Sequence, residues 1–377
     1  MAEPRGISYT PSEEQELIRS TARQFLEDRL GLDKVRHLMR SEEGFDPVLW
    51  KEMAELGWTG LGIAEEHGGS GLSFIEMGVL LEEMGRLLTP GPFFASAVMA
   101  TTTVRELANP HQQAELLPSL ASGETIATVA IFEEARNWSP ESPETTATRQ
   151  GDGWVLNGRK RSVLNGADAD LLLVTAASGD EVGIFAVDAS LDGVVIEPEP
   201  VLDLTRRQSA VTFDAVPVDG EARLGVGDSS AGLRKVLAVA TAGLAAEQVG
   251  GAQTCLDMSV DYAKTRYQFG RPIGSYQAIK HRCANMLMKV EHSRSTVHHA
   301  VRVTDHPEEL AIAAPLAGSV ASEAYVWVAG ETIQVHGGIG FTWEHDAHLY
   351  LKRAQASSLL FGGPRHQRDL MGRAIGI

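Results

Sequence analysis

Cysteine and basic residues are scarce in this sequence of 377 residues. The two cysteines, Cys255 and Cys283, both lie in apolar patterns of helical period, which predicts buried thiols in a reducing compartment and not a disulfide framework. Lysine and arginine number 33 against 50 aspartates and glutamates, so the net charge is −17. Because nucleic-acid binding depends on clustered Lys and Arg, this balance argues against nucleic acid as a general partner. It is compatible with a local basic pocket for a small anionic ligand.

Several sequence signatures are also missing. The stretch Met1–Gly6 lacks the charged-then-apolar pattern of an export signal, and no uninterrupted apolar run reaches membrane-spanning length. We therefore expect a cytoplasmic protein with no membrane partner. Neither a Gly-x-Ser-x-Gly elbow nor a strand-to-helix Gly-x-Gly-x-x-Gly turn is present, so a serine hydrolase and a Rossmann nicotinamide site have no support. The histidines do not follow zinc-site spacing, and no metal site is predicted.

The period of the apolar residues divides the chain into three parts. It is helical as far as residue 121, and we interpret the glycine-rich stretch Gly60–Gly71 as a turn between helices, because it lacks the Lys-Ser/Thr ending of a phosphate loop. Short β-branched or alternating runs then predict an antiparallel barrel or sandwich. These runs are 125–132, 147–150, 153–161, 171–176, 183–188, 194–198 and 208–216. From Leu233 to Arg373 the period is helical again, in about four long segments.

This division predicts a mainly α fold of the multidomain α+β class. We expect an N-terminal helical domain over 1–123, a middle β domain over 124–228 and a C-terminal helical bundle over 229–377.

The most informative stretch is Asp261–Arg282, where two helical patterns meet at a short basic elbow. Gly270-Arg271-Pro272 breaks the pattern, because proline removes a backbone donor and glycine tolerates positive φ. Arg266, Gln268 and Phe269, just before the bend, offer a cation, an amide and an aromatic face to an anionic, aromatic-bearing ligand. The alternative is an ordinary helix pair whose arginine is merely solvated.

A second glycine cluster lies at Gln334–Thr342, after another helical pattern. Its paired glycines let the backbone turn tightly and let a ligand approach the bare main chain. Alone, such a stretch is a common helix C-terminal cap. Its residue types complement the elbow, and together the two stretches predict a site that brackets a dinucleotide phosphate.

In this order, on either side of long helices, the two stretches resemble the acyl-CoA dehydrogenase family. Asn157–Asp170 and Gly60–Gly71 resemble the family's β-domain segment and early loop, so the resemblance covers nearly the whole chain. The family fold is an N-terminal helical domain, a middle β-barrel or sandwich domain and a C-terminal four-helix bundle, which agrees with the division above.

The resemblance implies an acyl-CoA substrate and FAD bound between protomers of a homo- or hetero-tetramer, with an electron-transferring flavoprotein as electron acceptor. In the family, the elbow and the second stretch reach the pyrophosphate and adenosine part of a neighbour's flavin. A guanidinium suits a pyrophosphate because it forms charge-assisted hydrogen bonds. The matching residues here are Arg266, Gln268, Phe269, Gln334, Gly337 and Gly338.

The sequence departs from the family at the flavin face. In Ala130–Arg136, Phe132 stands where the family has a threonine that hydrogen-bonds the isoalloxazine ring. Ser162-Val163-Leu164-Asn165 stands where the family has Trp-Ile-Thr-Asn. Such hydrogen bonds tune the flavin. The resemblance therefore leaves open whether this chain holds a flavin of its own.

The usual catalytic base is also missing from its place. The reaction needs a carboxylate that removes the α-proton of the thioester while hydride passes from Cβ to flavin N5, and burial raises the pKa of such a carboxyl. Leu360–Arg365 matches the family's Tyr-Glu-Gly-Thr, with Gly362 in the base position, and the alternative position on an earlier helix is Ala240. Glu247 lies about two turns later on that helix. It is either a relocated base or an acid paired with a nearby Lys or Arg.

The residues are compatible with three interpretations. The first is an FAD-dependent acyl-CoA dehydrogenase with an unusual base. The second is the base-lacking subunit of a hetero-oligomer, which gives its elbow to a partner's flavin in the degradation of fatty acids or bulky thioesters such as steroid side chains. The third is an acyl-CoA- or flavin-binding structural homologue with no redox role. The missing base and flavin-face residues favour the second over the first, and the intact elbow argues against the third.

Overall fold

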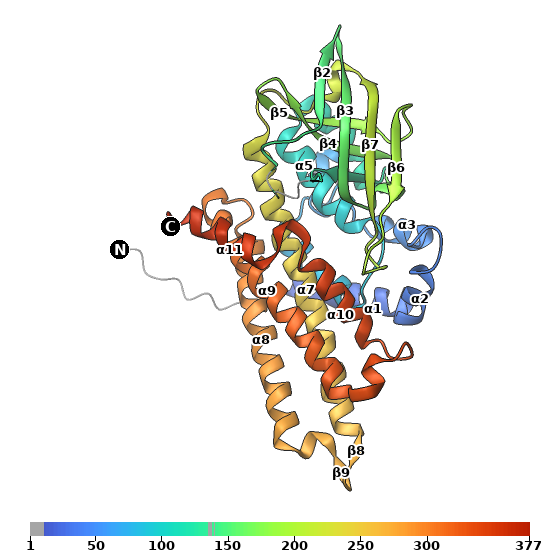
Figure 1. Cartoon of the computed structure of the whole chain (residues 1–377), viewed down its shortest axis with the longest axis vertical. Helices are drawn as coiled ribbons and strands as arrows, with labels where there is room; N and C mark the ends of the chain where they lie inside the picture. Colours follow the sequence, from blue (N-terminus) through green and yellow to red (C-terminus); the bar gives the residue numbers. More distant parts are fainter. Residues whose placement is uncertain (1–10, 135–137, 139) are drawn as a thin grey trace.

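The computed structural model describes residues 11–134, 138 and 140–377. The expectations for Met1–Gly6, and for Ala135 and Arg136 in the flavin-face stretch, lie outside these residues. Figure 1 shows a sheet at one end of the long axis and a small hairpin at the other, with a helical bundle between them.

The N-terminal part is helical, as predicted. Ser12, Ser73 and Asn109 each form a capping box, which satisfies free N–H groups at three helix starts. The first helical stretch is divided into α1 and α2, because the chain turns at Gly31, whose φ is 56°. The helices are α1 (Glu13–Arg29), α2 (Gly31–Leu38), α3 (Pro47–Glu55), η1 (Glu65–His67), α4 (Phe74–Arg86), the π-helix η2 (Phe94–Ala100), α5 (Thr101–Leu107) and α6 (Pro110–Ala121).

The middle part is a seven-stranded sheet, and each strand overlaps a predicted run. The strands are β1 (Ala127–Ala130), β2 (Thr146–Gln150), β3 (Gly153–Leu164), β4 (Leu171–Ser178), β5 (Glu181–Asp188), β6 (Val194–Pro198) and β7 (Gln208–Val218). Their order is β1-β4-β2-β3-β7-β6, with β5 paired to β4. The prediction of an antiparallel sheet is wrong at β4, which pairs in parallel with both β1 and β2. The β2–β3 excursion between β1 and β4 supplies the long crossover that parallel strands need.

The C-terminal part is a helical bundle of three long and two shorter helices rather than four long ones. These are α7 (Ser230–Thr265), α8 (Gln277–Arg302), α9 (Pro307–His336), α10 (Ala347–Ser357) and α11 (Gly363–Ala374). The backbones of α4 and α7 touch at two glycines. A Cβ on Gly250 would lie 1.8 Å from the Glu82 carbonyl oxygen, and one on Gly85 would lie 2.0 Å from that of Glu247. This close contact fixes the segment of α7 that carries Glu247.

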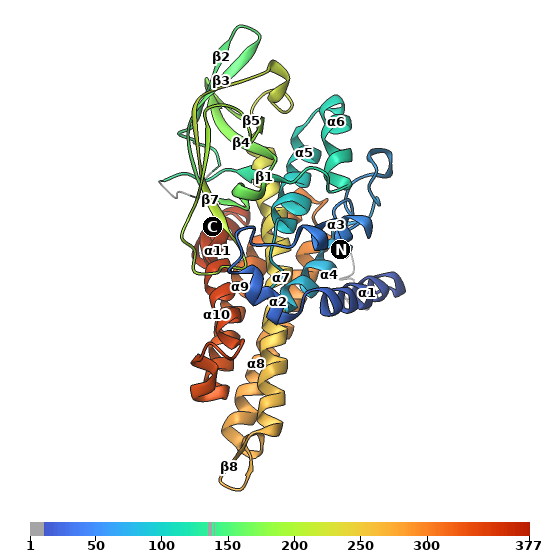
Figure 2. The ribbon, with the colours of Figure 1, turned by 90° about the vertical axis from the view of Figure 1, so that its right-hand side faces the viewer.

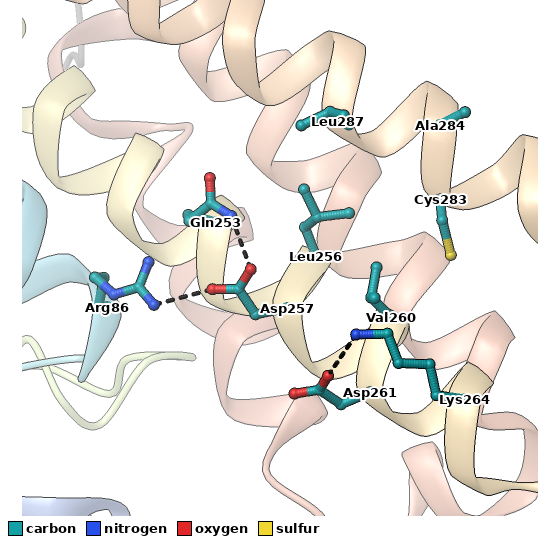
Figure 3. A pocket seen from close by; sticks show the side chains of 10 residues that line it. All are labelled: Arg86, Gln253, Leu256, Asp257, Val260, Asp261, Lys264, Cys283, Ala284 and Leu287. Atoms are coloured by element: carbon teal, nitrogen blue, oxygen red, sulfur yellow. Dashed lines mark hydrogen bonds and ion pairs between the residues drawn. The ribbon is translucent and has the colours of Figure 1, made fainter.

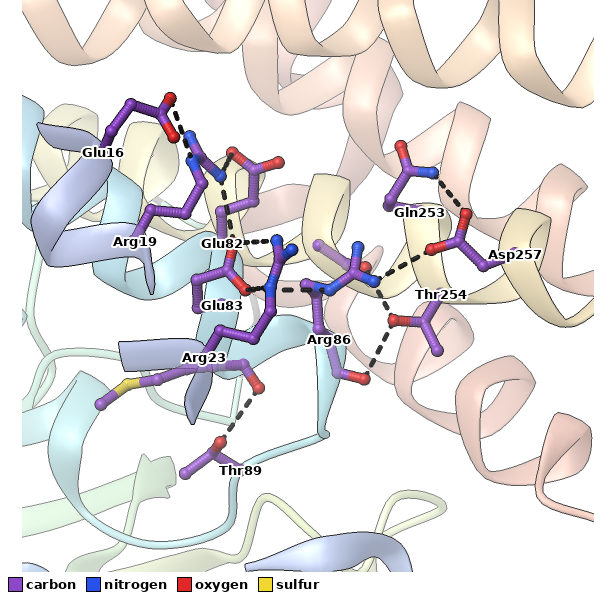
Figure 4. Close-up of polar contacts among 12 residues, drawn as sticks. Glu16, Arg19, Arg23, Glu82, Glu83, Arg86, Thr89, Gln253, Thr254 and Asp257 are labelled. Carbon is purple, nitrogen blue, oxygen red and sulfur yellow. Dashed lines mark hydrogen bonds and ion pairs between the residues drawn. The ribbon is translucent and has the colours of Figure 1, made fainter. Parts of the chain in front are cut away.

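Ion pairs join the N-terminal helices to the bundle (Figure 4). Arg19 and Arg23 of α1 contact Glu83 of α4 at 3.1 and 2.9 Å, and Arg86 of α4 contacts Asp257 of α7 at 2.9 Å. The views in Figures 1 and 2 place these helices beside α7, between the sheet and the hairpin.

Helix α9 and the turn η6 (Gly337–Phe341) after it form one 35-residue stretch that is long and apolar enough to cross a membrane. However, 61% of its most apolar window is buried inside the protein. Since α9 packs against α7, α8 and α11, it is a core helix of the bundle.

Candidate functional site

The elbow is a two-stranded hairpin at the far end of the bundle (Figure 1). Helix α7 ends at Thr265, and β8 (Tyr267–Gln268) pairs with β9 (Arg271–Pro272). The turn between them has positive φ at both residues, 52° at Phe269 and 79° at Gly270. A bulky side chain rarely adopts this conformation, and such strain is concentrated at functional sites. Phe269 is 92% exposed, so burial of its side chain within the protein does not stabilise the turn.

The second glycine cluster lies at the same end of the bundle. Helix α9 ends at His336, and Gly337 follows with φ 62°. A Cβ on Gly337 or Gly338 would meet no atom within 4 Å, so the main chain here is open to a ligand. The His336 ring stacks on Tyr262, with centroids 4.4 Å apart. The Tyr262 carbonyl accepts the backbone N–H of Arg266 at 2.8 Å, so this stack links the end of α9 to the turn of α7 that leads into the elbow.

These two stretches fit the phosphate side of a dinucleotide. The side chains of Arg266, Gln268, Phe269 and Gln334 are all exposed. Among residues 11–134, 138 and 140–377, no carboxylate forms an ion pair with Arg266. An exposed guanidinium beside bare main chain can hold a pyrophosphate through charge-assisted hydrogen bonds.

Aromatic rings pack together around Phe132, the residue that the resemblance places at the flavin face. Phe132 contacts Phe361 with ring centroids 6.3 Å apart, and Phe361 contacts Phe94 at 6.4 Å. Phe361 and Phe94 are buried, and Trp138 packs edge-on to Phe132 at 4.9 Å. Rings at these separations attract one another. A phenyl ring has no hydrogen-bonding group, so Phe132 cannot supply the hydrogen bond that the family's threonine gives to an isoalloxazine ring.

Glu247 lies in a buried cluster of charges next to these rings. Its carboxylate accepts hydrogen bonds from Arg206 and from Arg353, the latter at 2.6 Å, and all three side chains are 8% exposed or less. Arg353 also pairs with Asp203 at 2.6 Å, and the Arg206 guanidinium lies 5.0 Å from the centre of the Phe94 ring. Glu247 was expected to be either a relocated base or an acid paired with a nearby Lys or Arg. The structure shows it paired with two arginines.

The electrostatics of this cluster do not favour proton abstraction. Burial alone would raise the pKa of the Glu247 carboxyl, but the guanidinium groups of Arg206 and Arg353 outweigh burial and hold that pKa below its ordinary value. A base suited to this reaction needs a raised pKa. A catalytic role for Glu247 therefore stays a prediction without support from its surroundings.

The other two candidate base positions carry no carboxylate. Ala240 is a buried methyl on α7. Gly362 has φ 95°, and a Cβ there would lie 2.4 Å from the His366 ring. A side chain at Gly362 would need His366 to move. The buried side chain of this turn, η7 (Leu360–Gly362), is that of Phe361.

A cavity of about 700 Å³ lies between α7 and α8, beside the end of α4 (Figure 3). The ion pairs Arg86–Asp257 and Lys264–Asp261 line this cavity. Its lining contains none of the predicted site residues, so we do not assign it to the site. Within the part of the chain that the structure describes, no group of three or more metal-binding side chains is present.

The sequence matches known proteins over its full architecture. Residues 12–124 match the acyl-CoA dehydrogenase N-terminal domain, 128–216 the middle domain and 233–376 the C-terminal domain. Acyl-CoA dehydrogenase IpdE2 of Mycolicibacterium smegmatis is 37% identical over 358 residues, which cover 94% of this chain and 97% of that protein. The chain belongs to the acyl-CoA dehydrogenase family. It is an oxidoreductase acting on CH–CH groups.

Solved structures of the family have the same fold. A variant of the Tcur3481-Tcur3483 steroid ACAD superposes on this acyl-CoA dehydrogenase with a TM-score of 0.87 at 33% identity, covering 96% of this chain and 98% of that one. The ChsE4-ChsE5 complex from Mycobacterium tuberculosis gives 0.90 at 28% identity, with 98% and 99% covered. The three-part mainly helical fold is therefore confirmed.

Sequence reasoning missed Phe361, Arg206 and Arg353. Their partners are distant in the chain. Phe361 contacts Phe94 and Phe132, and Glu247 lies 41 positions from Arg206 and 106 from Arg353. One local signal was present: two charged residues, Lys352 and Arg353, interrupt the apolar pattern of the helix α10.

Proposed function

We propose that this acyl-CoA dehydrogenase is the base-lacking subunit of a hetero-oligomer. Its elbow (Arg266, Gln268 and Phe269) and its second stretch (Gln334, Gly337 and Gly338) would hold the pyrophosphate and adenosine part of an FAD whose flavin ring lies in a partner subunit. The observation that carries the proposal is the contrast between the two sides of the chain. In the described part of the chain, Arg266 on the phosphate side is exposed and forms no ion pair, whereas on the flavin side Phe132 packs against Phe361 and Phe361 against Phe94.

Within such a complex, the roles of the chain's residues follow from their contacts. Arg266 binds phosphate oxygens, Gln268 and Gln334 supply amides, and Phe269 covers an aromatic surface. Bound FAD supplies the hydride acceptor of the reaction. The carboxylate that removes the α-proton would come from the partner, because Arg206 and Arg353 occupy the oxygens of Glu247 and lower its pKa, which makes it a weak base.

The names of solved relatives support a mixed assembly. ChsE4-ChsE5 is named as a complex of two polypeptides, and the Tcur3481-Tcur3483 enzyme is named as a steroid ACAD. By analogy, the substrate we propose is a bulky acyl-CoA thioester of fatty-acid or steroid degradation. The complex would be a cytoplasmic tetramer that passes electrons to an electron-transferring flavoprotein.

Two alternatives make different predictions. In a homotetramer with Glu247 as base, each chain needs a flavin ring where Phe132 and Phe361 now pack. A structural homologue without redox role has no need for an exposed, strained Phe269 turn. Both features favour the mixed assembly.

The test is co-expression with acyl-CoA dehydrogenase polypeptides that keep the Tyr-Glu-Gly-Thr motif. The proposal predicts a stable complex that turns over an acyl-CoA, while the chain alone does not. Arg266→Gln should weaken FAD binding by the complex about tenfold or more, since a hydrogen bond to a charged group is lost. Lys264→Gln, which removes the same charge from a neighbouring exposed residue, is the matched control. Turnover by the chain alone would overturn the proposal.

A further inference from the structure

The elbow carries a second arginine whose position is set by the hairpin. In the β8–β9 register Gln268 lies opposite Arg271, and directly opposite residues point their side chains to one face. Arg266 has extended backbone, and its carbonyl accepts the N–H of Ile273 at 2.8 Å, so the ladder continues to it. Residues two apart on a strand share a face. Arg266, Gln268 and Arg271 therefore share one face of the hairpin.

Tyr276 holds this arginine in place. The Arg271 guanidinium carbon lies 4.0 Å from the centre of the Tyr276 ring. The Tyr276 hydroxyl donates a hydrogen bond to the carbonyl oxygen of Gln268 at 3.0 Å. One side chain thus contacts both strands of the hairpin. A guanidinium stacked on a ring keeps its N–H donors at its edges, where they remain available.

Negative charges from two helix ends and from a bound diphosphate would be better balanced by two cations than by one. Helices α7 and α9 both end here, at Thr265 and His336, and each helix C-terminus carries about half a negative charge. The start of α8 at Gln277 offsets only one of them. A diphosphate brings two more negative charges, which one guanidinium at Arg266 does not balance.

Arg271 is free to serve as that cation. In the described ranges, no carboxylate forms an ion pair with it, and its side chain is exposed. By contrast, the nearby Lys264 already pairs with Asp261 at 3.4 Å.

We propose that Arg271, positioned by Tyr276, is a second diphosphate-binding residue of the elbow, next to Arg266. The proposal rests on the proposed function, because it assumes that the elbow binds the diphosphate of a partner's FAD. It adds a binding residue, Arg271, and a positioning residue, Tyr276.

The experiment measures FAD affinity of the apo-complex by quenching of flavin fluorescence, with ADP and adenosine as competitors. Arg271→Gln should weaken FAD and ADP binding about tenfold and leave adenosine unchanged, because only the phosphate contact is lost. Arg271→Lys should recover part of the loss. Tyr276→Leu, which removes both the ring and the hydroxyl, should approach the effect of Arg271→Gln. Tyr276→Phe, which keeps the ring, should be several-fold milder.

Two reference variants separate failure of this inference from failure of the proposed function. If Arg266→Gln weakens binding and Arg271→Gln does not, the role of Arg271 is refuted and the proposed function stands. If neither substitution affects binding beyond the Lys264→Gln control, the elbow does not bind the diphosphate. Both the role of Arg271 and the proposed function are then refuted. If Arg271→Gln weakens ADP and adenosine equally, the arginine acts on the fold of the hairpin and the inference is overturned.

Discussion

Replacing Glu247 by glutamine separates a structural acid from a catalytic one. The side chains of Glu247, Arg206 and Arg353 are 8%, 8% and 3% exposed, so the substitution leaves two buried guanidinium groups without their shared carboxylate. Removing one partner of a buried ion pair costs about 3–5 kcal/mol. A chain of 377 residues has an unfolding entropy of about 0.8 kcal/mol per degree, so the midpoint of thermal unfolding should fall by about 4–6 °C.

The matched control is Glu323→Gln, which breaks the exposed ion pair with Arg368. Exposed pairs contribute about 0–1 kcal/mol, so its midpoint should hardly move. The assay is calorimetry of each variant, together with acyl-CoA turnover by the complex. We expect lower stability of Glu247→Gln with the turnover per folded complex unchanged. Loss of turnover with unchanged stability would show instead that Glu247 is the base.

Other substitutions and pH probe the remaining parts of the account. Phe361→Ala removes a buried ring, so it should lower the free energy of unfolding by about 3–5 kcal/mol, measured by denaturant titration. A free energy of unfolding within about 1 kcal/mol of wild type would contradict the packing described. Gly362→Glu should lower the free energy of unfolding by about 1–3 kcal/mol, because the new side chain meets a positive φ and the His366 ring. It should give the isolated chain no dehydrogenase activity. Turnover by this variant would show that only the carboxylate was missing. Burial lowers the pKa of His336 and His345 below the ordinary 6.5, so the unfolded chain binds more protons and stability should fall as the pH drops below 6.5. That decline should be shallower in His345→Gln, and an equal slope would contradict it.

The histidine prediction depends on every charged group around the pair. His336 and His345 lie with ring centroids 4.3 Å apart. Around His345, Asp346 raises the pKa, whereas His348 and Arg36 lower it. Since Arg36 and Asp346 form an ion pair at 2.7 Å, their effects largely offset each other, and burial decides the direction.

The strands were predictable because alternation and β-branched residues are local signals. All seven runs became strands, yet the parallel pairing of β1 with β4 depends on a crossover that no short window contains. The division between α1 and α2 falls at a glycine, Gly31, which is visible in the sequence. The period of the apolar residues alone does not reveal it.

The elbow was predictable in outline and not in detail. Gly270 and Pro272 indicated where α7 would end, but positive φ at Phe269 goes against the preference of a bulky residue. The partners of Glu247 were beyond prediction, because they come from the β6–β7 loop and from α10, and only the fold brings Arg206 and Arg353 to one carboxylate.

The most direct test of the central claim is the FAD content of the chain, purified alone and with its partner. We expect the chain purified alone to be colourless, because Phe132, at the proposed flavin face, offers a phenyl ring packed on Phe361 in place of a hydrogen-bonding group. With the partner, we expect one FAD for each pair of different chains, held about tenfold or more weakly in Arg266→Gln. One tightly bound FAD on each isolated chain, with turnover abolished in Glu247→Gln, would contradict the central claim.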